Sequence, residues 1–252
     1  RERRKKWEAD QWQKEIARAQ KKVAQAIRKA SGQPSSLRAI PAEEWEGIAE
    51  EDYARYLVKD DKWKQKYKEP AAPDTESLAE LPKGWAWTNM HQTAEHRLGK
   101  MLDRGKNTGT PRPYLRNLNV RWFHFNLSDI QHMRIRDEEL SSVSVREGDL
   151  VICEGGEPGR AAVWRYQKPM AIQKALHRVR LHPNISPDYI NIRLASDANL
   201  GNLGRYFTGS TIKHFTGQSL RSYAYALPPV AEQLRIVAEV ERRLSVIANI
   251  ER

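Results

Sequence analysis

The glycine-rich run VICEGGEPGRAAVW at residues 151–164 is the first stretch that could carry chemistry, because it joins two apolar segments. Glycines in such a place suit a loop that binds phosphate through its backbone N–H groups. This loop lacks both the GxG pattern and the Lys-Ser/Thr pair of phosphate loops, and Glu154 and Glu157 would repel a phosphate. The glycines are better suited to a tight or bulged turn between two buried strands. We therefore predict a structural turn, from which Arg160 could still point toward a ligand.

Other motifs that could support catalysis are incomplete. GKMLDRGKN at 99–107 has five residues between its glycines where a phosphate loop has four, and Asn107 replaces the Ser or Thr that binds Mg²⁺. DDK at 60–62 has the Asp-x-Lys of some metal-dependent nucleases without a partner carboxylate on a strand. LPPV at 227–230 lacks the acid or amide and the aromatic residue of a DNA-methyltransferase motif, and Cys153 has no metal ligand beside it. We predict no catalytic residue, no metal site and no cofactor.

Two stretches have the composition of a nucleic-acid contact. PRPYLRNLNVRWFHF at 111–125 alternates arginines with aromatic residues, and GSTIKHFTGQSLRS at 209–222 places cations among small residues. Arg can donate two hydrogen bonds to guanine and Asn can bind adenine, and both also bind phosphate. Solvated edge strands and surface loops have the same composition, and that alternative stays open. The predicted DNA-binding residues are Arg112, Tyr114, Arg116, Asn117, Asn119 and Arg121, then Arg160, Gln173 and Lys174, then Lys213 and His214.

Short strands and one helix are predicted to position these residues. The apolar runs indicate strands near 113–120, 149–154, 161–166 and 177–181, with a further strand in SYAYALPP that ends at 229. SPDYINIRLASD at 186–197 begins with Ser and Pro, which is typical of a helix N-terminus. Residues 81–228 should therefore form one compact domain of mixed α+β architecture.

Two long helices with apolar seams are predicted on either side of this domain. Residues 2–30 contain neither Pro nor Gly, and 229–252 begins with Pro229, which suits a first helical turn. The seam positions, three or four residues apart, are Trp12, Ile16 and Val23 in the first helix and Leu234, Val237, Leu244 and Ile247 in the second. Such seams require a helical partner, either each other or another chain. The acidic stretch 31–80 contains prolines and several aromatic residues, so we predict a linker that packs on its neighbours.

The charge of the 252-residue chain favours a polyanionic partner. Its 43 Lys and Arg against 32 Asp and Glu give a net charge of +11, which points to nucleic acid first and an anionic membrane surface second. No apolar run approaches the roughly 18–20 residues that cross a bilayer, and no signal-peptide pattern is present. A single cysteine fits a reducing, cytoplasmic location. The chain begins with Arg1 inside a helical pattern, so we expect a piece of a longer protein.

Several stretches follow one another in a familiar order: PYLRNLNVRW, REGDLVICEGGEPGRAAVW, QKALHRVRL, TGSTIKHFTG and LPPVAEQLRIVAEVERRLS. RRKKWEADQW and DDKWKQKYKEPAAPDT precede them. Together they resemble the DNA specificity (S) subunit of type I restriction-modification systems over nearly the whole chain. GDLVICEGGEPGR and LPPVAEQLRIV are the most specific parts of the resemblance.

The resemblance implies the second half of such a subunit. In that family each recognition domain binds one half of a split double-stranded DNA site, and the helices set the distance between the halves. Modification subunits, which methylate adenine, dock on the assembly, a restriction subunit joins through the complex, and the specificity subunit has no catalysis of its own. A shortened distal helix would leave seam residues without partners, and a homodimer would cover them. No membrane partner is implied. The parts would be 1–30, the central spacer helix; 31–80, the linker; 81–228, the target recognition domain; and 229–252, the start of the distal helix.

Two alternatives remain at this point. A nuclease or methyltransferase fragment would need its whole active site to come from a missing portion. A non-specific nucleic-acid-binding or coiled-coil scaffold protein would bind without preference between duplex sequences and would lose affinity steeply with salt. Its arginine-and-aromatic stretch would then stack on single-stranded bases.

Overall fold

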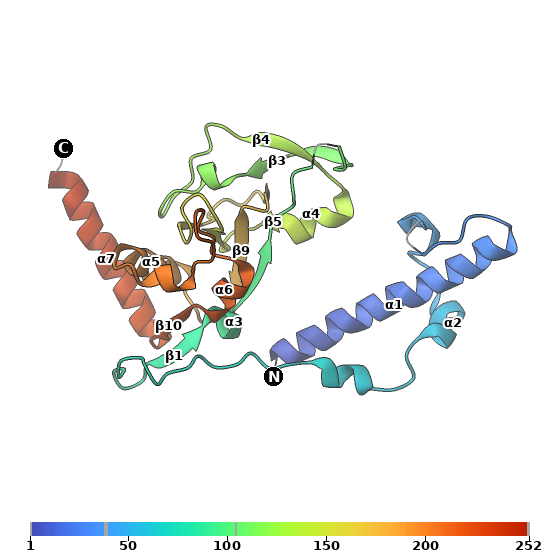
Figure 1. Cartoon of the computed structure of the whole chain (residues 1–252), viewed down its shortest axis with the longest axis horizontal. Coiled ribbons are helices and arrows are strands. Elements are labelled where there is room, and N and C mark those ends of the chain that lie inside the picture. Colours follow the sequence, from blue (N-terminus) through green and yellow to red (C-terminus); the bar gives the residue numbers. More distant parts are fainter. Residues whose placement is uncertain (1, 38–39, 104, 251–252) are drawn as a thin grey trace. The chain divides into compact units, whose positions relative to one another are not determined.

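The chain forms two compact units, Arg1–Pro70 and Ala71–Arg252, in a computed structural model that describes residues 2–37, 40–103 and 105–250 (Figure 1). The second unit begins before residue 81, where the change in composition placed it. Residues 71–79 run along its first strand, since Asn89 donates to the carbonyl of Ala71 at 2.9 Å and Trp87 to that of Ala79 at 2.9 Å. Helices and strands both contribute, which confirms the predicted α+β class.

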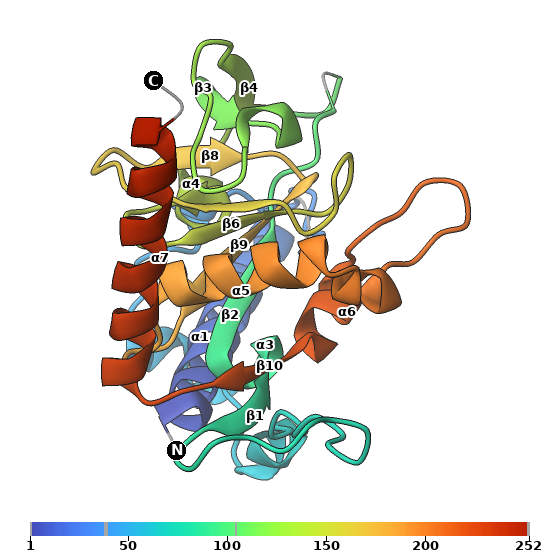
Figure 2. The ribbon, with the colours of Figure 1, turned by 90° about the vertical axis from the view of Figure 1, so that its left-hand side faces the viewer.

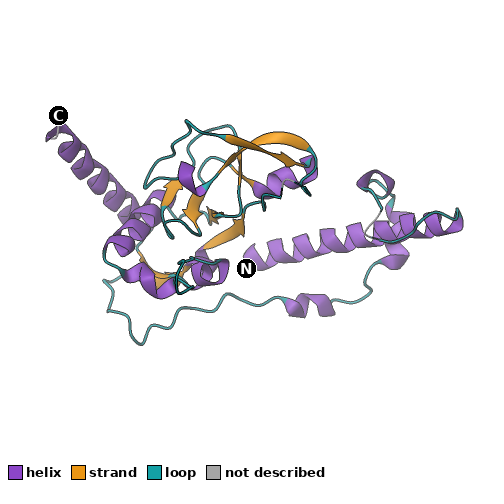
Figure 3. Ribbon diagram, turned by 45° about the horizontal axis from the view of Figure 1, so that its top comes forward, coloured by secondary structure: helices purple, strands orange, loops and turns teal. Residues whose placement is uncertain are grey.

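Unit 1 consists of one long helix and a segment that returns along it. The helix, α1 (Glu2–Ala30), spans the predicted range and is followed by Gly32, whose φ of 70° is left-handed. The following segment, which we call the return segment (residues 40–67), contains only short helical turns in its described part (Figure 3). They are η1 (Ala42–Glu44), α2 (Glu50–Tyr53), η2 (Ala54–Tyr56) and η3 (Lys62–Lys66).

The return segment covers the apolar seam of α1. Val23 is buried in a cluster with Tyr53, and Ile16 packs against that cluster. Further along the helix, the rings of Trp12 and Trp63 stack with their centroids 6.2 Å apart. The seam of α1 is therefore covered within unit 1. We predicted a helical partner, either the other long helix or another chain; instead, aromatic side chains of the return segment supply the apolar surface.

Replacing Trp63 with alanine should loosen unit 1 and leave unit 2 unchanged. The rings of Trp7 and Trp12 lie 6.0 Å and 6.2 Å from that of Trp63, so the substitution removes both contacts. We expect a loss of about 2 kcal/mol, because each aromatic pair adds ~0.5–1.5 kcal/mol beyond the buried area. Hydrogen exchange should accelerate in residues 59–67 and in the first turns of α1. Wild-type exchange in both places would contradict the packing.

Unit 2 contains three sheets with helices packed around them (Figures 1 and 2). The sheets are β1–β10, β2–β9–β6–β7 and β4–β3–β8–β5, and the pairing of β3 with β8 is parallel. The strands are β1 (Ala86–Asn89), β2 (Ala94–Leu98), β3 (Thr110–Leu115), β4 (Gln131–Ile135), β5 (Ser144–Val145), β6 (Leu150–Cys153), β7 (Ala161–Val163), β8 (Met170–Ile172), β9 (Leu176–Leu181) and β10 (Ala224–Leu227). The helices are α3 (Met90–Thr93), α4 (Asp137–Val143), η4 (Asn117–Asn119), α5 (Pro187–Asn199), η5 (Asn202–Tyr206), α6 (Gly217–Ser222) and α7 (Val230–Ile250).

Strand β6 lies between the two main hydrophobic cores. Its alternate side chains point to opposite faces of the sheet, so Leu150 and Ile152 enter one core while Val151 and Cys153 enter the other. All four are buried, which explains the continuous apolar run in the sequence. The strand predicted at 113–120 begins and ends earlier, because the chain folds into η4 after β3.

Helix α7 is attached to the rest of unit 2 by a buried polar residue. Gln233 is 1% exposed; its amide donates to the carbonyl of Pro228 at 2.9 Å and accepts from the N–H of Ser186 at 2.8 Å. Ser186 in turn caps α5, as predicted, by accepting from the N–H of Tyr189. Because α7 packs through the face that carries Gln233 and Val237, only part of its predicted seam is covered. Leu234 and Leu244 are 57% and 51% exposed, and the side chain of Ile247 lies outside the described residues.

Candidate nucleic-acid interface

Four loops of unit 2 meet at one end of the β6–β7 pair. The backbone N–H of Phe215 donates to the carbonyl of Glu154 at 2.7 Å, and the N–H of Glu154 donates to that of Ala175 at 2.9 Å. The guanidinium of Arg160 donates to the carbonyl of Asn117 at 3.0 Å. The structure thus brings together every segment that carries a predicted DNA-binding residue except β3. We call this set the loop cluster; it comprises residues 116–125, 154–160, 173–175 and 207–216.

The glycine-rich loop is the turn between β6 and β7, as predicted. Gly156 and Gly159 have φ values of 83° and 90°, a left-handed conformation that other residues rarely adopt. A Cβ atom on Gly156 would lie 2.5 Å from the side-chain nitrogen of Asn117, and one on Gly159 would lie 2.6 Å from Leu203. The glycines therefore allow the turn to lie closely against two neighbouring segments.

Arg160 links this turn to the 116–125 loop from the inside. It is 8% exposed and donates to the carboxylate of Glu157 at 2.5 Å as well as to the carbonyl of Asn117. The other oxygen of Glu157 accepts from the indole N–H of Trp122 at 2.9 Å. These contacts occupy the guanidinium, so the structure gives Arg160 a role within the fold in place of the predicted base contact. Glu157, which looked repulsive to an anion in the sequence, carries a charge that Arg160 balances.

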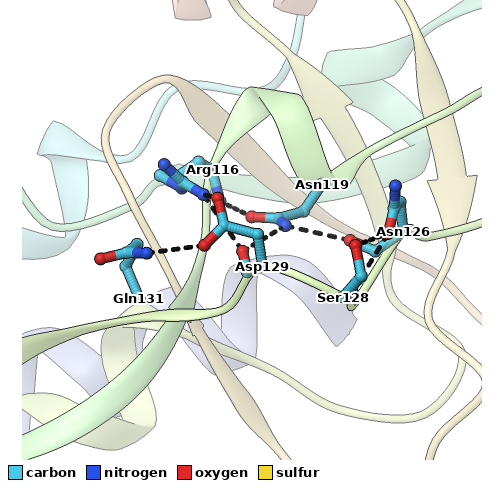
Figure 4. Close-up of polar contacts among 6 residues, drawn as sticks. All are labelled: Arg116, Asn119, Asn126, Ser128, Asp129 and Gln131. Atoms are coloured by element: carbon cyan, nitrogen blue, oxygen red, sulfur yellow. Dashed lines mark hydrogen bonds and ion pairs between the residues drawn. The ribbon is translucent and has the colours of Figure 1, made fainter.

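Asn119 also has a role within the fold (Figure 4). It is 3% exposed, and its amide donates to the carbonyls of Asn126 and Asp129, both at 3.0 Å. Its side-chain oxygen accepts from the N–H of Arg116 at 2.9 Å, which caps η4. Tyr114, at the end of β3, is 4% exposed and belongs to a core cluster. The amide of Asn119 is therefore occupied within the fold, and Tyr114 packs in the core cluster.

Two more of the predicted arginines, besides Arg160, form ion pairs. Arg112 pairs with Asp137 at 2.7 Å, and Arg116 pairs with Asp129 at 2.5 Å (Figure 4). The hydrogen bond from Arg116, helped by one from Gln131, holds the pKa of Asp129 below its usual value. Both pairs are partly exposed, so a phosphate could exchange with the carboxylate at little cost.

The remaining predicted residues lie at the surface of the loop cluster. Lys174, Lys213 and His214 are exposed, whereas Asn117, Arg121 and Gln173 are half-buried. Within the described part of the chain, neither lysine pairs with a carboxylate, and the only side-chain hydrogen bond of Asn117 is a long one of 3.4 Å to Gly155. Of the predicted residues, these six can therefore exchange water for DNA groups with the smallest loss of hydrogen bonds and ion pairs within the protein.

The residues from Thr208 to His214 form a small hairpin, which we call the finger. Thr208 and His214 exchange backbone hydrogen bonds of 2.9 Å in both directions. Gly209 has a φ of 94°, and a Cβ atom there would lie 2.2 Å from the carbonyl oxygen of Ile212. Figure 2 shows this segment standing away from α5 and α6. A narrow turn that only glycine permits therefore holds its tip in place.

His177 supports the base of the finger from the core. It is fully buried in β9, and its Nε2 donates to the carbonyl of Phe215 at 2.8 Å. Burial lowers the pKa of His177 to about 4, so its ring is neutral at neutral pH.

A hollow of about 600 Å³ lies between residues 71–78 and α6. Arg205 and Arg221 line it, together with Gln218. Among the described residues neither arginine has a carboxylate partner; Arg205 contacts the ring and hydroxyl of Tyr206 instead. The hollow therefore contains two cations of unit 2 that lie outside the loop cluster, together with one acid, Asp74.

Chemistry at a metal site would need several ligating side chains close together in residues 2–37, 40–103 or 105–250. No cluster of three or more metal-ligating side chains occurs there, and no helix in these ranges is long and apolar enough to cross a membrane. Burial raises the pKa of the Cys153 thiol to about 11, which leaves it unreactive at neutral pH.

Sequence reasoning missed three exposed apolar residues beside the predicted cations. Ile212 is 66% exposed at the tip of the finger, Leu118 is 57% exposed, and Phe123 is 45% exposed with a left-handed φ of 70°. A single apolar residue among the polar residues of GSTIKH was a usable signal for Ile212. Nothing in the sequence indicates the conformation of Phe123, which follows from the hydrogen bond of its N–H to the carbonyl of Ala161.

No protein-family model matches the chain, but known proteins are similar to it in sequence. The chain is 30% identical over 152 residues to the type I restriction enzyme EcoKI specificity subunit of Escherichia coli K12. The alignment covers 58% of this chain and 33% of that protein. The chain is also 24% identical over 206 residues to the EcoEI specificity subunit of Escherichia coli, covering 73% of this chain and 33% of that protein. The chain thus spans about a third of the length of these relatives.

Two solved structures share the fold at 19% identity. The HsdS subunit from Thermoanaerobacter tengcongensis superposes with a TM-score of 0.51 over 70% of this chain and 41% of that chain. A chain from a study of complex assembly and conformational transition of the type I R-M system superposes with a TM-score of 0.54 over 69% of this chain and 42% of that one. These likenesses confirm the architecture.

Proposed function

We propose that this chain, which is similar to type I restriction enzyme specificity subunits, is part of such a subunit, and that unit 2 is a target recognition domain that binds one half of a bipartite double-stranded DNA site. The observation that carries the proposal is the loop cluster, in which separate loops place donors without carboxylate partners on one surface. Donors of this kind supply both phosphate and base contacts. In this proposal the chain selects the site and performs no catalysis.

The proposed contacts fall into two groups. Asn117 and Gln173 carry amides that can bind the edge of adenine, and His214 carries ring nitrogens suited to base or phosphate. Lys174 and Lys213 are point charges suited to phosphates. Arg112, Arg116 and Arg121 remain proposed contacts that would exchange intramolecular partners or water for the DNA backbone.

The helices are proposed to organise the larger assembly. We infer that α1 and α7 act as spacer helices, onto which modification subunits dock, and that a restriction subunit joins through them. Support comes from the length of α1 and from the exposed side chains of Leu234 and Leu244 on α7. A homodimer of this chain through the same side chains is also proposed, and its mass in solution tests it.

Selection of the whole chain against a random duplex library at two salt concentrations tests the proposed function. We expect recovery of an asymmetric motif of ~3–5 base pairs that persists at the higher salt, because base contacts depend less on salt than phosphate contacts. An unenriched library, with binding that disappears as salt rises, would favour the alternative that the net charge of +11 supports, a non-specific nucleic-acid-binding scaffold.

Replacing Lys213 with alanine should weaken binding to all duplex sequences alike. A lysine that neutralises one phosphate contributes about one unit to the slope of log affinity against log salt, so the slope should fall by about one. Fluorescence anisotropy on the selected duplex and on a scrambled duplex gives both slopes. Lys83→Ala is the matched control, since Lys83 is an exposed lysine of unit 2 outside the loop cluster. A loss confined to one base pair would contradict the phosphate assignment.

A further inference from the structure

The tip of the finger exposes an aliphatic side chain that the fold does not use. Ile212 is 66% exposed, and the residues beside it, Thr211 and Lys213, are exposed and polar. Single exposed apolar residues are common on protein surfaces, so exposure by itself decides nothing. The place of Ile212 is what matters: it lies at the projecting end of a loop that belongs to a surface rich in cations.

The finger presents Ile212 in a defined position. The paired backbones of Thr208 and His214 close the hairpin, and the left-handed Gly209 leaves room for the carbonyl of Ile212. At its base, the N–H of Phe215 donates to Glu154 while the carbonyl of Phe215 accepts from His177. A tip that is already ordered loses little conformational entropy when it binds.

A finger of two backbone segments joined by one pair of hydrogen bonds, with an apolar residue at its tip, suits the major groove of DNA. That groove is about 12 Å wide and admits a two-stranded β-ribbon. Its floor offers one apolar group, the 5-methyl of thymine, against which an aliphatic side chain can pack. Lys213, next to Ile212 in the chain, would then lie where a phosphate can be reached.

We propose that the finger enters the major groove and that Ile212 recognises a thymine in the half-site by packing on its 5-methyl group. The inference rests on the proposed DNA recognition by unit 2 and assigns to Ile212 one specificity-determining contact of that function. It makes the apolar tip a reader of A·T orientation, because the methyl marks the thymine strand of the pair. Insertion of Ile212 between base steps, as apolar wedges do in the minor groove, is the competing geometry.

The test replaces each thymine of the selected half-site, one at a time, with deoxyuridine, which removes the methyl and keeps the base-pairing hydrogen bonds. For the whole wild-type chain, one deoxyuridine should lower affinity about fourfold, the value of one buried methyl-sized group. Ile212→Ala should lower affinity for the thymine duplex by at least a similar factor. Ile212→Ala should bind the duplex with that one deoxyuridine about as tightly as it binds the thymine duplex, since the two changes remove the same contact.

Val230→Ala is the matched control. Val230 is a 43% exposed aliphatic residue of unit 2 at the start of α7, outside the side chains proposed for docking, and α7 lies on the other side of the unit from the finger in Figure 2. This variant should bind every duplex as the wild type does, and an unchanged melting temperature of Ile212→Ala would exclude loss of fold.

Three results would overturn the inference and leave the proposed function standing. They are a selected motif without thymine, affinities of the wild type that no deoxyuridine changes, and losses for Ile212→Ala and deoxyuridine that simply multiply. A loss for Ile212→Ala with no effect of deoxyuridine would indicate the wedge geometry. Failure to select any motif would overturn both proposals together.

Discussion

Replacing Arg160 with alanine is expected to lower the free energy of unfolding of unit 2 by about 2–3 kcal/mol and to weaken sequence-selective DNA binding at every base position. The guanidinium is nine-tenths buried and links Glu157 with the carbonyl of Asn117. Removing one partner of a buried pair costs ~3–5 kcal/mol, and the exposure of Glu157, 51%, places this case below that range. Because Trp122 is held through Glu157, the loss should spread across the loop cluster.

Urea unfolding and the half-site selection measure the two effects. Arg165→Ala is the control: Arg165 is 62% exposed and pairs with Asp188, so its loss should cost less than about 1 kcal/mol. The experiment also decides between the two roles of Arg160. If Arg160→Ala keeps wild-type stability and loses discrimination at a single base pair, the guanidinium contacts that base, as the sequence predicted.

Acidification from pH 7 to pH 4 is expected to remove about 3 kcal/mol of stability through His177 alone. Burial lowers the pKa of His177 in the folded protein to about 4, against an ordinary value near 6.5 in the unfolded chain. Between these values the unfolded chain binds the proton and the folded protein does not, so stability falls as pH falls. Each pKa unit corresponds to ~1.4 kcal/mol, and the contribution is fully present above pH 6.5.

The difference between the wild type and His177→Gln isolates this contribution. Glutamine can donate to the carbonyl of Phe215 but does not titrate, and carboxylates with lowered pKa values, such as Asp129, act equally in both proteins. Urea unfolding at pH 7, 6, 5 and 4 should give a steeper decline for the wild type. Parallel pH profiles would show that His177 is not buried as a neutral ring.

Several features of this protein could be predicted from residues that are close together in the sequence. The glycine-rich run indicated a turn, the Ser-Pro entry indicated α5, and the absence of Pro and Gly indicated α1, because caps, turns and helical propensity act within a few residues. Strands with two buried faces were also predictable, since their apolar runs are continuous. β2 and β4 were missed because charged and polar residues interrupt their pattern, with only Met133 and Ile135 buried in β4.

The roles of the polar side chains were decided by the tertiary structure. Arg160 and Asn119 have the composition of DNA-binding residues, but their partners, Asn117 and Asp129, come close only when the chain folds. A donor that is satisfied inside the protein and one left for DNA look alike in a sequence. The sequence by itself therefore indicated the resemblance to specificity subunits, and it determined the main turns and helices and the segments that form the loop cluster. Only the fold decided which cations are occupied and that Ile212 stands at a projecting tip, because burial and hydrogen-bond partners depend on residues far apart in the chain.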